Sequence, residues 1–126
     1  MEHPSTPAPP EVEAAVTAVV DAAVMEAQRQ AEHLTTTTPA PSGLPAALVA
    51  SESLLGLYLQ ARAGLDVTRE VVLHRRQGTT WQQIGQATGM TRQSAHERWA
   101  PAVRSILDRY ATGELAHLAA PDGSPS

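Results

Sequence analysis

The sequence predicts an all-α protein of about six helices. Apolar residues recur at the three- and four-residue spacing of helices along most of the chain, and no stretch alternates apolar and polar residues as a strand would. Clusters of proline, glycine and threonine divide the chain into helix-sized segments. The length of 126 residues suits one compact domain with an appendage.

Composition divides the chain into five parts. Residues 1–9 and 119–126 are rich in small and turn-forming residues, and we expect them to be disordered tails. Residues 10–34 form an amphipathic helix, and residues 35–43, with the sequence TTTTPAPSG, form a linker. Residues 44–118 then make up the main domain.

The helix expected over residues 10–34 carries a stripe of valine and alanine. Pro10 suits its first turn, and Glu11 and Glu13 favour the positive end of the helix dipole. The opposite face is acidic, which opposes binding to anionic membranes. We therefore expect the stripe to pack on protein, either within the subunit or across a dimer.

Two further helices precede the most informative segment. One is expected over residues 45–63, with Pro45 in its first turn and Gly64 at its end. Its leucines are distributed around more of the helix than one narrow apolar stripe would cover. This pattern predicts that the helix is buried on more than one side or lies in an oligomer interface. The next helix is expected over residues 67–77, capped by Asp66.

Residues 80–99 carry the clearest helix signals in the chain. Thr80 and Gln83 have the spacing of a capping box for a helix over residues 81–88. Gly89 is placed to take the positive φ of a tight turn.

A second short helix follows this turn. Thr91 is placed to cap a helix over residues 92–99. Pro101 lacks the N–H that a helix interior needs, so we expect a separate helix to restart there and to run to about Thr112.

The segment TWQQIGQATGMTRQSAHERW meets the packing needs of a helix-turn-helix. Ile84 supplies an apolar anchor, and Gly85 supplies the small residue where the second helix crosses. Met90, Ala95 and Trp99 are spaced to plug the junction and to face the core.

This segment resembles the helix-turn-helix of small bacterial transcription regulators and of the promoter-reading domain of sigma factors, in which W-x-x-I-G-x-x-x-G-x-[ST]-R-Q-[AS] recurs. Thr88 departs from the pattern, because an aliphatic residue is usual there. The resemblance implies a core of three or four helices and reading of the DNA major groove. The first 60 residues or so resemble no such family.

A recognition helix that enters the major groove by its N-terminus would read bases with its outward side chains. Arg92 suits guanine and Gln93 suits adenine, while Glu97 could accept from cytosine or bond within its own helix. Trp81 could pack on a sugar but fits the core better. The expected DNA-contacting residues are Thr80, Gln82, Thr91, Arg92, Gln93, Ser94, His96 and Arg98.

Phosphate contacts are expected from the flanking basic residues and from the start of the helix over residues 81–88. The Thr80 hydroxyl and the backbone amides that open that helix suit an anion. Arginines at the helix ends suit phosphates as well. Arg75 and Arg76 could equally do no more than stabilise the negative end of the dipole of their own helix. The expected phosphate-contacting arginines are Arg75, Arg76, Arg98 and Arg104.

The charge distribution agrees with this surface. The net charge is −4, which by itself argues weakly against nucleic acid. Residues 1–61 hold seven acids and one arginine, whereas residues 62–109 hold eight arginines and four acids. The second region therefore has a net charge of +4. Phosphate responds to this local charge, because charges farther away than a Debye length of about 10 Å are largely screened.

Other function classes find little support in the sequence. There is no cysteine, and the five histidines lack metal-ligand spacing, so we expect no metal and no cofactor. No phosphate-binding loop or nucleophile motif is present, and we expect no enzyme. No apolar run approaches the length of a membrane span, and the N-terminus lacks a secretory signal, so we expect a cytoplasmic protein.

The sequence therefore predicts specific binding to double-stranded DNA by a transcriptional regulator, such as a repressor. We expect a homodimer through residues 10–63, because one short recognition helix reads few bases. The alternative is an interaction module, in which the helix-turn-helix is only structural and the N-terminal helix docks RNA polymerase or a partner regulator. No pocket-forming constellation is visible in the sequence, so it does not indicate whether a small-molecule effector regulates binding.

Overall fold

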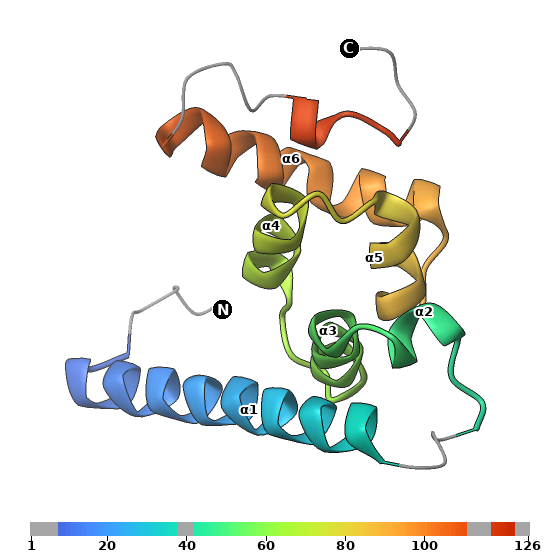
Figure 1. Ribbon diagram of the computed structural model, residues 1–126. Helices are drawn as coiled ribbons and strands as arrows, with labels where there is room; N and C mark the ends of the chain where they lie inside the picture. The colour runs from blue at the N-terminus through green and yellow to red at the C-terminus, as the bar shows by residue number, and fades with distance from the viewer. Residues whose placement is uncertain (1–7, 38–41, 111–116, 123–126) are drawn as a thin grey trace, which may run out of the picture.

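The computed structural model describes residues 8–37, 42–110 and 117–122, and in these residues it contains six α-helices and no strand. The predicted all-α fold of about six helices is confirmed. α1 lies at one end of the molecule and α6 at the other, with α3, α4 and α5 between them (Figure 1). The helices are α1 (Pro10–Thr36), α2 (Ala46–Val49), α3 (Glu52–Arg62), α4 (Thr68–Arg76), α5 (Trp81–Thr88) and α6 (Arg92–Tyr110).

α1 is a long helix that packs mainly on α3 and only near its own C-terminal end. Its one fully buried residue is Ala31, which faces Gly56 of α3. Thr35 and Thr36, expected in the linker, instead extend α1, and both of their hydroxyls donate to the Glu32 carbonyl at 3.0 Å. The middle of the expected linker, residues 38–41, lies outside the described residues.

The prediction of a single helix over residues 45–63 is wrong. The chain forms α2, turns at Ala50, and starts again as α3. Ser51 is the reason, because its hydroxyl accepts a hydrogen bond from the Leu54 amide at 3.1 Å and so caps a new helix. Pro45 is correspondingly the residue before α2 rather than part of its first turn.

α3 occupies the centre of the fold, between α1 on one side and α5 on the other. Leu54, Leu55 and Leu57 are all buried. The expectation that this segment is buried on more than one side is therefore confirmed, and the cause is packing within the subunit.

α4 begins one residue later than expected, at Thr68, and Asp66 supports its start from outside the helix. The Asp66 carboxylate accepts from the Thr68 amide at 3.0 Å and from the Thr68 hydroxyl at 2.7 Å. Val67 occupies the cap position and is buried in the core.

The expected break at Pro101 does not occur, because α6 continues through it. The carbonyl that loses its helical partner is that of Glu97, which is exposed and can bond to water instead. Trp99, Ala100 and Val103 are buried on the inner face, so packing holds the helix on both sides of the proline. The expected end near Thr112 lies outside the described residues.

Residues 117–122, which we call the C-terminal strap, return to the core. Leu118 and Ala119 are buried with the helices. The composition assigned residues from 119 onward to a disordered tail, and that assignment is wrong for residues 119–122. The strap runs beside α6, as Figure 1 shows in red.

Candidate nucleic-acid interface

α5 is built as its local sequence predicts. The Thr80 hydroxyl accepts from the Gln83 amide at 3.1 Å, and the Gln83 side chain accepts from the Thr80 amide at 2.9 Å, which completes the capping box. Trp81 and Ile84 are fully buried. Trp81 is thus a core residue and does not present its ring to solvent.

The turn between α5 and α6 brings the backbone unusually close to α5. Gly89 has φ of 79°, and the Met90 amide donates to the Gly85 carbonyl at 2.8 Å. A Cβ on Gly85 would lie 2.6 Å from the Met90 carbonyl oxygen and 3.0 Å from that of Thr91. The small residue is therefore required by the turn itself, as well as by the crossing helix.

Thr88, the one departure from the helix-turn-helix pattern, is accommodated inside α5. Its hydroxyl donates to the Ile84 carbonyl at 2.8 Å, so the polar group is satisfied without leaving the helix.

The first two turns of α6 present one face to solvent and one to the core. Thr91 caps the helix by accepting from the Ser94 amide at 3.0 Å. Arg92, Gln93 and Ser94 are exposed, whereas Ala95 is buried. This arrangement places the expected base-reading pair on the outside of a firmly anchored helix.

Glu97 is engaged within α6. Its carboxylate accepts from the Gln93 amide side chain at 3.1 Å, one helical turn away. The prediction that Glu97 bonds within its own helix agrees with this contact, and it leaves Arg92 as the outward side chain with the longest reach.

His96 does not belong to the outward face. It is half-buried, and its Nε2 lies 2.9 Å from the Ala119 carbonyl oxygen, so this nitrogen donates. Its ring also meets the Trp81 ring edge-on, with centroids 5.4 Å apart. The expectation that His96 reads bases is therefore wrong in this structure, because the strap occupies its hydrogen-bonding edge.

Arg75 is also held by the strap and is not free for phosphate. It is buried, its Nε donates to the Leu118 carbonyl at 2.7 Å, and its guanidinium lies over the Trp81 ring. A second bond runs from Nη1 to the Thr79 carbonyl at 2.6 Å. Burial lowers the pKa of Arg75, and the Asp122 carboxylate opposes that shift.

The backbone amides that open α5 are already occupied by an anion from the same chain. The Asp122 carboxylate accepts from the Trp81 and Gln82 amides, both at 2.8 Å. These are the amides expected to hold a phosphate. The preference of a helix N-terminus for negative charge was predicted from sequence, but an acid 41 residues away supplies that charge.

The remaining expected contacts stay on the surface. Gln82, Arg76 and Arg104 are exposed. Arg98 is exposed as well, with its guanidinium 5.3 Å from the Trp99 ring centroid. The pKa of Asp66 lies below its usual value, chiefly through the Thr68 hydrogen bonds and to a smaller extent through the positive charge of Arg98.

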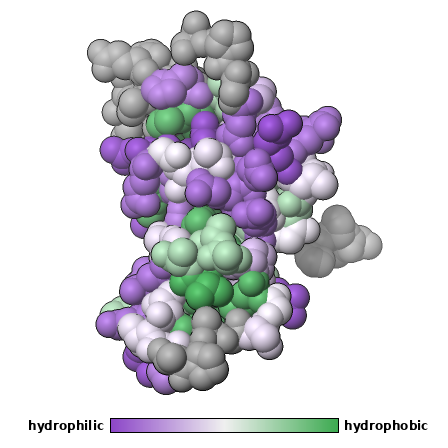
Figure 2. Space-filling model, turned by 45° about the vertical axis from the view of Figure 1, so that its right-hand side comes forward, coloured by the Kyte–Doolittle hydropathy of each residue, from purple (hydrophilic) through white to green (hydrophobic). Residues whose placement is uncertain are grey.

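The two ends of the molecule differ in surface character. Figure 2 shows hydrophilic residues over most of the α5–α6 end of this face, and an apolar patch toward the α1–α3 end. Among the exposed basic residues of α4, Arg69 lies close to α1, because it lines a pocket together with Asp21 of that helix.

The described residues contain neither a metal-binding cluster nor a membrane-spanning helix. No group of three or more His, Asp or Glu side chains there is arranged to hold a metal ion. None of the helices in that part of the chain combines the length and hydropathy that crossing a bilayer requires.

The fold and this surface define an all-α protein with a two-helix unit, α5 and α6, mounted on a helical core. Comparison of the chain with protein-family models, with curated proteins and with solved structures found no match.

Proposed function

We propose that the protein binds double-stranded DNA sequence-specifically, as a dimeric transcriptional regulator that reads the major groove with the N-terminal half of α6. The observation that carries the proposal is the exposed Arg92, Gln93 and Ser94 on a helix whose opposite face is anchored by Ala95 and Trp99. Rigid placement of a few outward polar side chains is what base readout requires.

The interface in this proposal is smaller than the sequence suggested. Arg92 reads bases, Gln93 does so by exchanging its bond to Glu97 for one to a base, and Arg76, Arg98 and Arg104 contact phosphates. His96 and Arg75 are removed from it, because both are bonded to the strap. Thr80 contributes little beyond its capping role, since its hydroxyl is already paired with Gln83.

We infer that the dimer forms through α1. Its N-terminal half bears four valines that are 44–69% exposed: Val12, Val16, Val19 and Val20. An apolar stripe of this kind on a helix that packs on its own subunit only near one end needs a protein partner. A second copy supplies an equal stripe, and two-fold symmetry would present two α6 helices to neighbouring turns of DNA.

The same stripe is the observation that favours the alternative, an interaction module. There, α1 would dock a different protein, and the α5–α6 unit would have no nucleic-acid partner. The two functions differ in what α6 does, so the test is made on α6.

The test is selection of bound sequences from a random DNA pool at about physiological salt. The wild type is compared with Arg92→Ala/Gln93→Ala and with the matched control Arg29→Ala/Gln30→Ala, which removes the same residue pair from α1. We expect the wild type and the control to enrich a palindrome with half-sites about 10 bp apart. The α6 variant should lose the enriched sequence, because each base contact contributes about 1–3 kcal/mol of discrimination.

Each other outcome has a definite meaning. No enrichment by the wild type overturns DNA binding and supports the interaction module. Enrichment that persists in the α6 variant means that another surface reads the bases. Enrichment of one isolated half-site contradicts the dimer while leaving DNA binding in place.

A further inference from the structure

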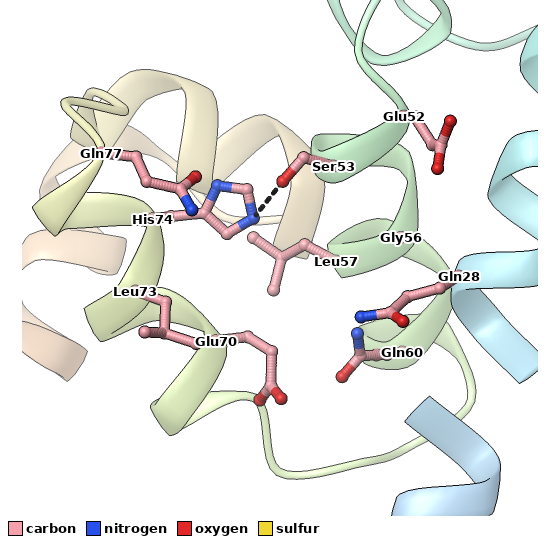
Figure 3. Close-up of a pocket in the computed structure, with 10 residues that line it drawn as sticks. All are labelled: Gln28, Glu52, Ser53, Gly56, Leu57, Gln60, Glu70, Leu73, His74 and Gln77. Carbon is pink, nitrogen blue, oxygen red and sulfur yellow. Dashed lines mark hydrogen bonds between the residues drawn. The ribbon is translucent and has the colours of Figure 1, made fainter. Parts of the chain in front are cut away.

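A pocket of about 420 Å³, lined by both polar and apolar side chains, lies between α1, α3 and α4, apart from the exposed face of α6. Figure 3 shows the side chains that line it. Gln28 comes from α1, Gln60 from α3, and Glu70 and Leu73 from α4. In Figure 3 the ends of Gln28, Gln60 and Glu70 point toward the same space.

Gln60 is the unusual residue of this pocket. It is only 3% exposed, and its Oε1 has no hydrogen-bond partner. Leaving a buried acceptor unpaired costs the desolvation of that group with nothing to offset it. Such a group on the wall of a pocket indicates that the missing partner is a molecule from outside the chain.

The other buried polar side chains of the described core make a direct contrast. His74 has a partner on each nitrogen, with Ser53 Oγ at 3.3 Å from Nε2 and Thr79 Oγ1 at 3.2 Å from Nδ1. Arg75 donates to two backbone carbonyls. The fold thus satisfies these two groups, and among the buried side chains that the structure describes it leaves only Gln60 with an unmet acceptor.

The lining defines the chemistry of the missing partner. Two carboxylates, Glu52 and Glu70, lie on the pocket, and no lysine or arginine is among the residues that line it. Burial lowers the pKa of His74, which favours the neutral ring, so His74 does not offset these negative charges. Leu57 and Leu73 supply apolar surface beside the acceptors.

We propose that this pocket binds a small primary alkylammonium ion. Its N–H groups donate to Gln60 Oε1 and to the Glu70 carboxylate, and its short aliphatic chain lies against Leu57 and Leu73. The site is independent of DNA binding, so the test below does not depend on the function proposed for α6.

The size of the pocket bears on the choice between an organic ion and water. A volume of about 420 Å³ exceeds the share of one water molecule, about 30 Å³, by an order of magnitude. A single ordered water could pair with Gln60 but would fill only a small part of this space. A short alkylammonium satisfies the acceptor, the charge and the apolar surface together.

The test is titration of the full chain with n-butylammonium chloride at constant ionic strength, followed by calorimetry and by thermal unfolding. We expect saturable binding and a rise in Tm. Tetramethylammonium, which has the same charge but no N–H donor, and n-butyrate, which has the opposite charge, should bind at least tenfold more weakly.

Gln60→Leu separates a ligand site from a structural role. Without ligand, this variant should have a higher Tm than the wild type, because the unpaired acceptor is gone, and it should bind n-butylammonium at least tenfold more weakly. Glu70→Gln keeps the shape but removes a charge, and it should bind at least fivefold more weakly. Gln86→Leu, an exposed glutamine of α5, is the matched control and should bind as the wild type does.

Three results would overturn the proposal. One is the absence of saturable binding to the wild type. A second is equal binding of tetramethylammonium, which means a general ionic effect. A third is a lower Tm for Gln60→Leu without ligand, which means that the amide is satisfied and structural.

Discussion

Around α5 and α6 the large apolar side chains that the structure describes are buried or half-buried, whereas along the first half of α1 four valines are exposed. Both regions carry the helical pattern, and both are helices. The difference is in what faces them. α5 and α6 pack on each other and on α3 and α4, while α1 has α3 beneath only its last turns.

Polar contacts follow the same division. At the α5–α6 end of the fold, the side chains of Arg75 on α4, Trp81 on α5 and His96 on α6 bond to three successive carbonyls of the strap. In α1, the Glu26 carboxylate meets only Arg29 and Gln30 of its own helix, which holds its pKa below the usual value. One region is held by tertiary contacts, and the other mainly by its own helix.

The largest effect is expected from a methyl group at the tight turn. Gly85→Ala should destabilise the protein by about 1–3 kcal/mol, because the added carbon must push backbone atoms that lie 2.6–3.1 Å away. Gly56→Ala, beneath α1, is the matched control, since its nearest neighbour would be the Ala31 methyl at 4.0 Å. It should be neutral or stabilising by about 0.5–1 kcal/mol. Urea unfolding measures both, and equal effects would contradict the contrast between the two regions.

The next effect concerns the strap. Asp122→Ala should lower the free energy of unfolding by about 1–2 kcal/mol, because the Trp81 and Gln82 amides lose their acceptor. Asp21→Ala removes the same charge from exposed α1 and should change stability by less than about 0.5 kcal/mol. If the Asp122 variant is as stable as the wild type, the strap does not cap α5 in solution.

A pH dependence is expected from buried His74. Burial lowers its pKa in the folded state below the ordinary value of 6.5, so the unfolded chain binds the proton more tightly. The contribution of the neutral His74 ring to the free energy of unfolding is complete above about pH 6.5. It is lost as the pH falls from there toward the folded-state pKa. Urea midpoints between pH 5 and 8 should show this slope, and His74→Gln should flatten it. His33→Gln, at the exposed end of α1, is the control and should leave the slope in place.

The smallest effect on stability is expected from α1. Val16→Ser/Val19→Ser should change the unfolding free energy of the dilute protein by no more than about 0.5 kcal/mol per site, because both side chains are already exposed. The same variant should lose self-association in sedimentation, since the proposed dimer buries this stripe. A wild type that is monomeric at all concentrations would remove the dimer from the proposal.

Much of the α5–α6 unit could be predicted because its signals are local. The Thr80 capping box, the positive φ of Gly89 and the burial of Trp81 and Trp99 each depend on residues a few positions apart. The break at Ser51 also has a local signal, a serine followed by an acid at a helix start, and could have been found. Pro101 shows the limit of such signals, because packing overrode a residue that usually ends a helix.

By itself, the sequence determined the helical class, the caps of α5 and α6, and which side of each short helix is apolar. Only the tertiary structure decided which polar side chains remain available to bind DNA or another ligand. It turned His96 and Arg75 from surface candidates into anchors of the strap, placed Asp122 at the start of α5, and left Gln60 buried without a partner. The physical reason is range: caps and periodicity act within about one or two helical turns, whereas the partner of a buried polar group can come from anywhere in the chain.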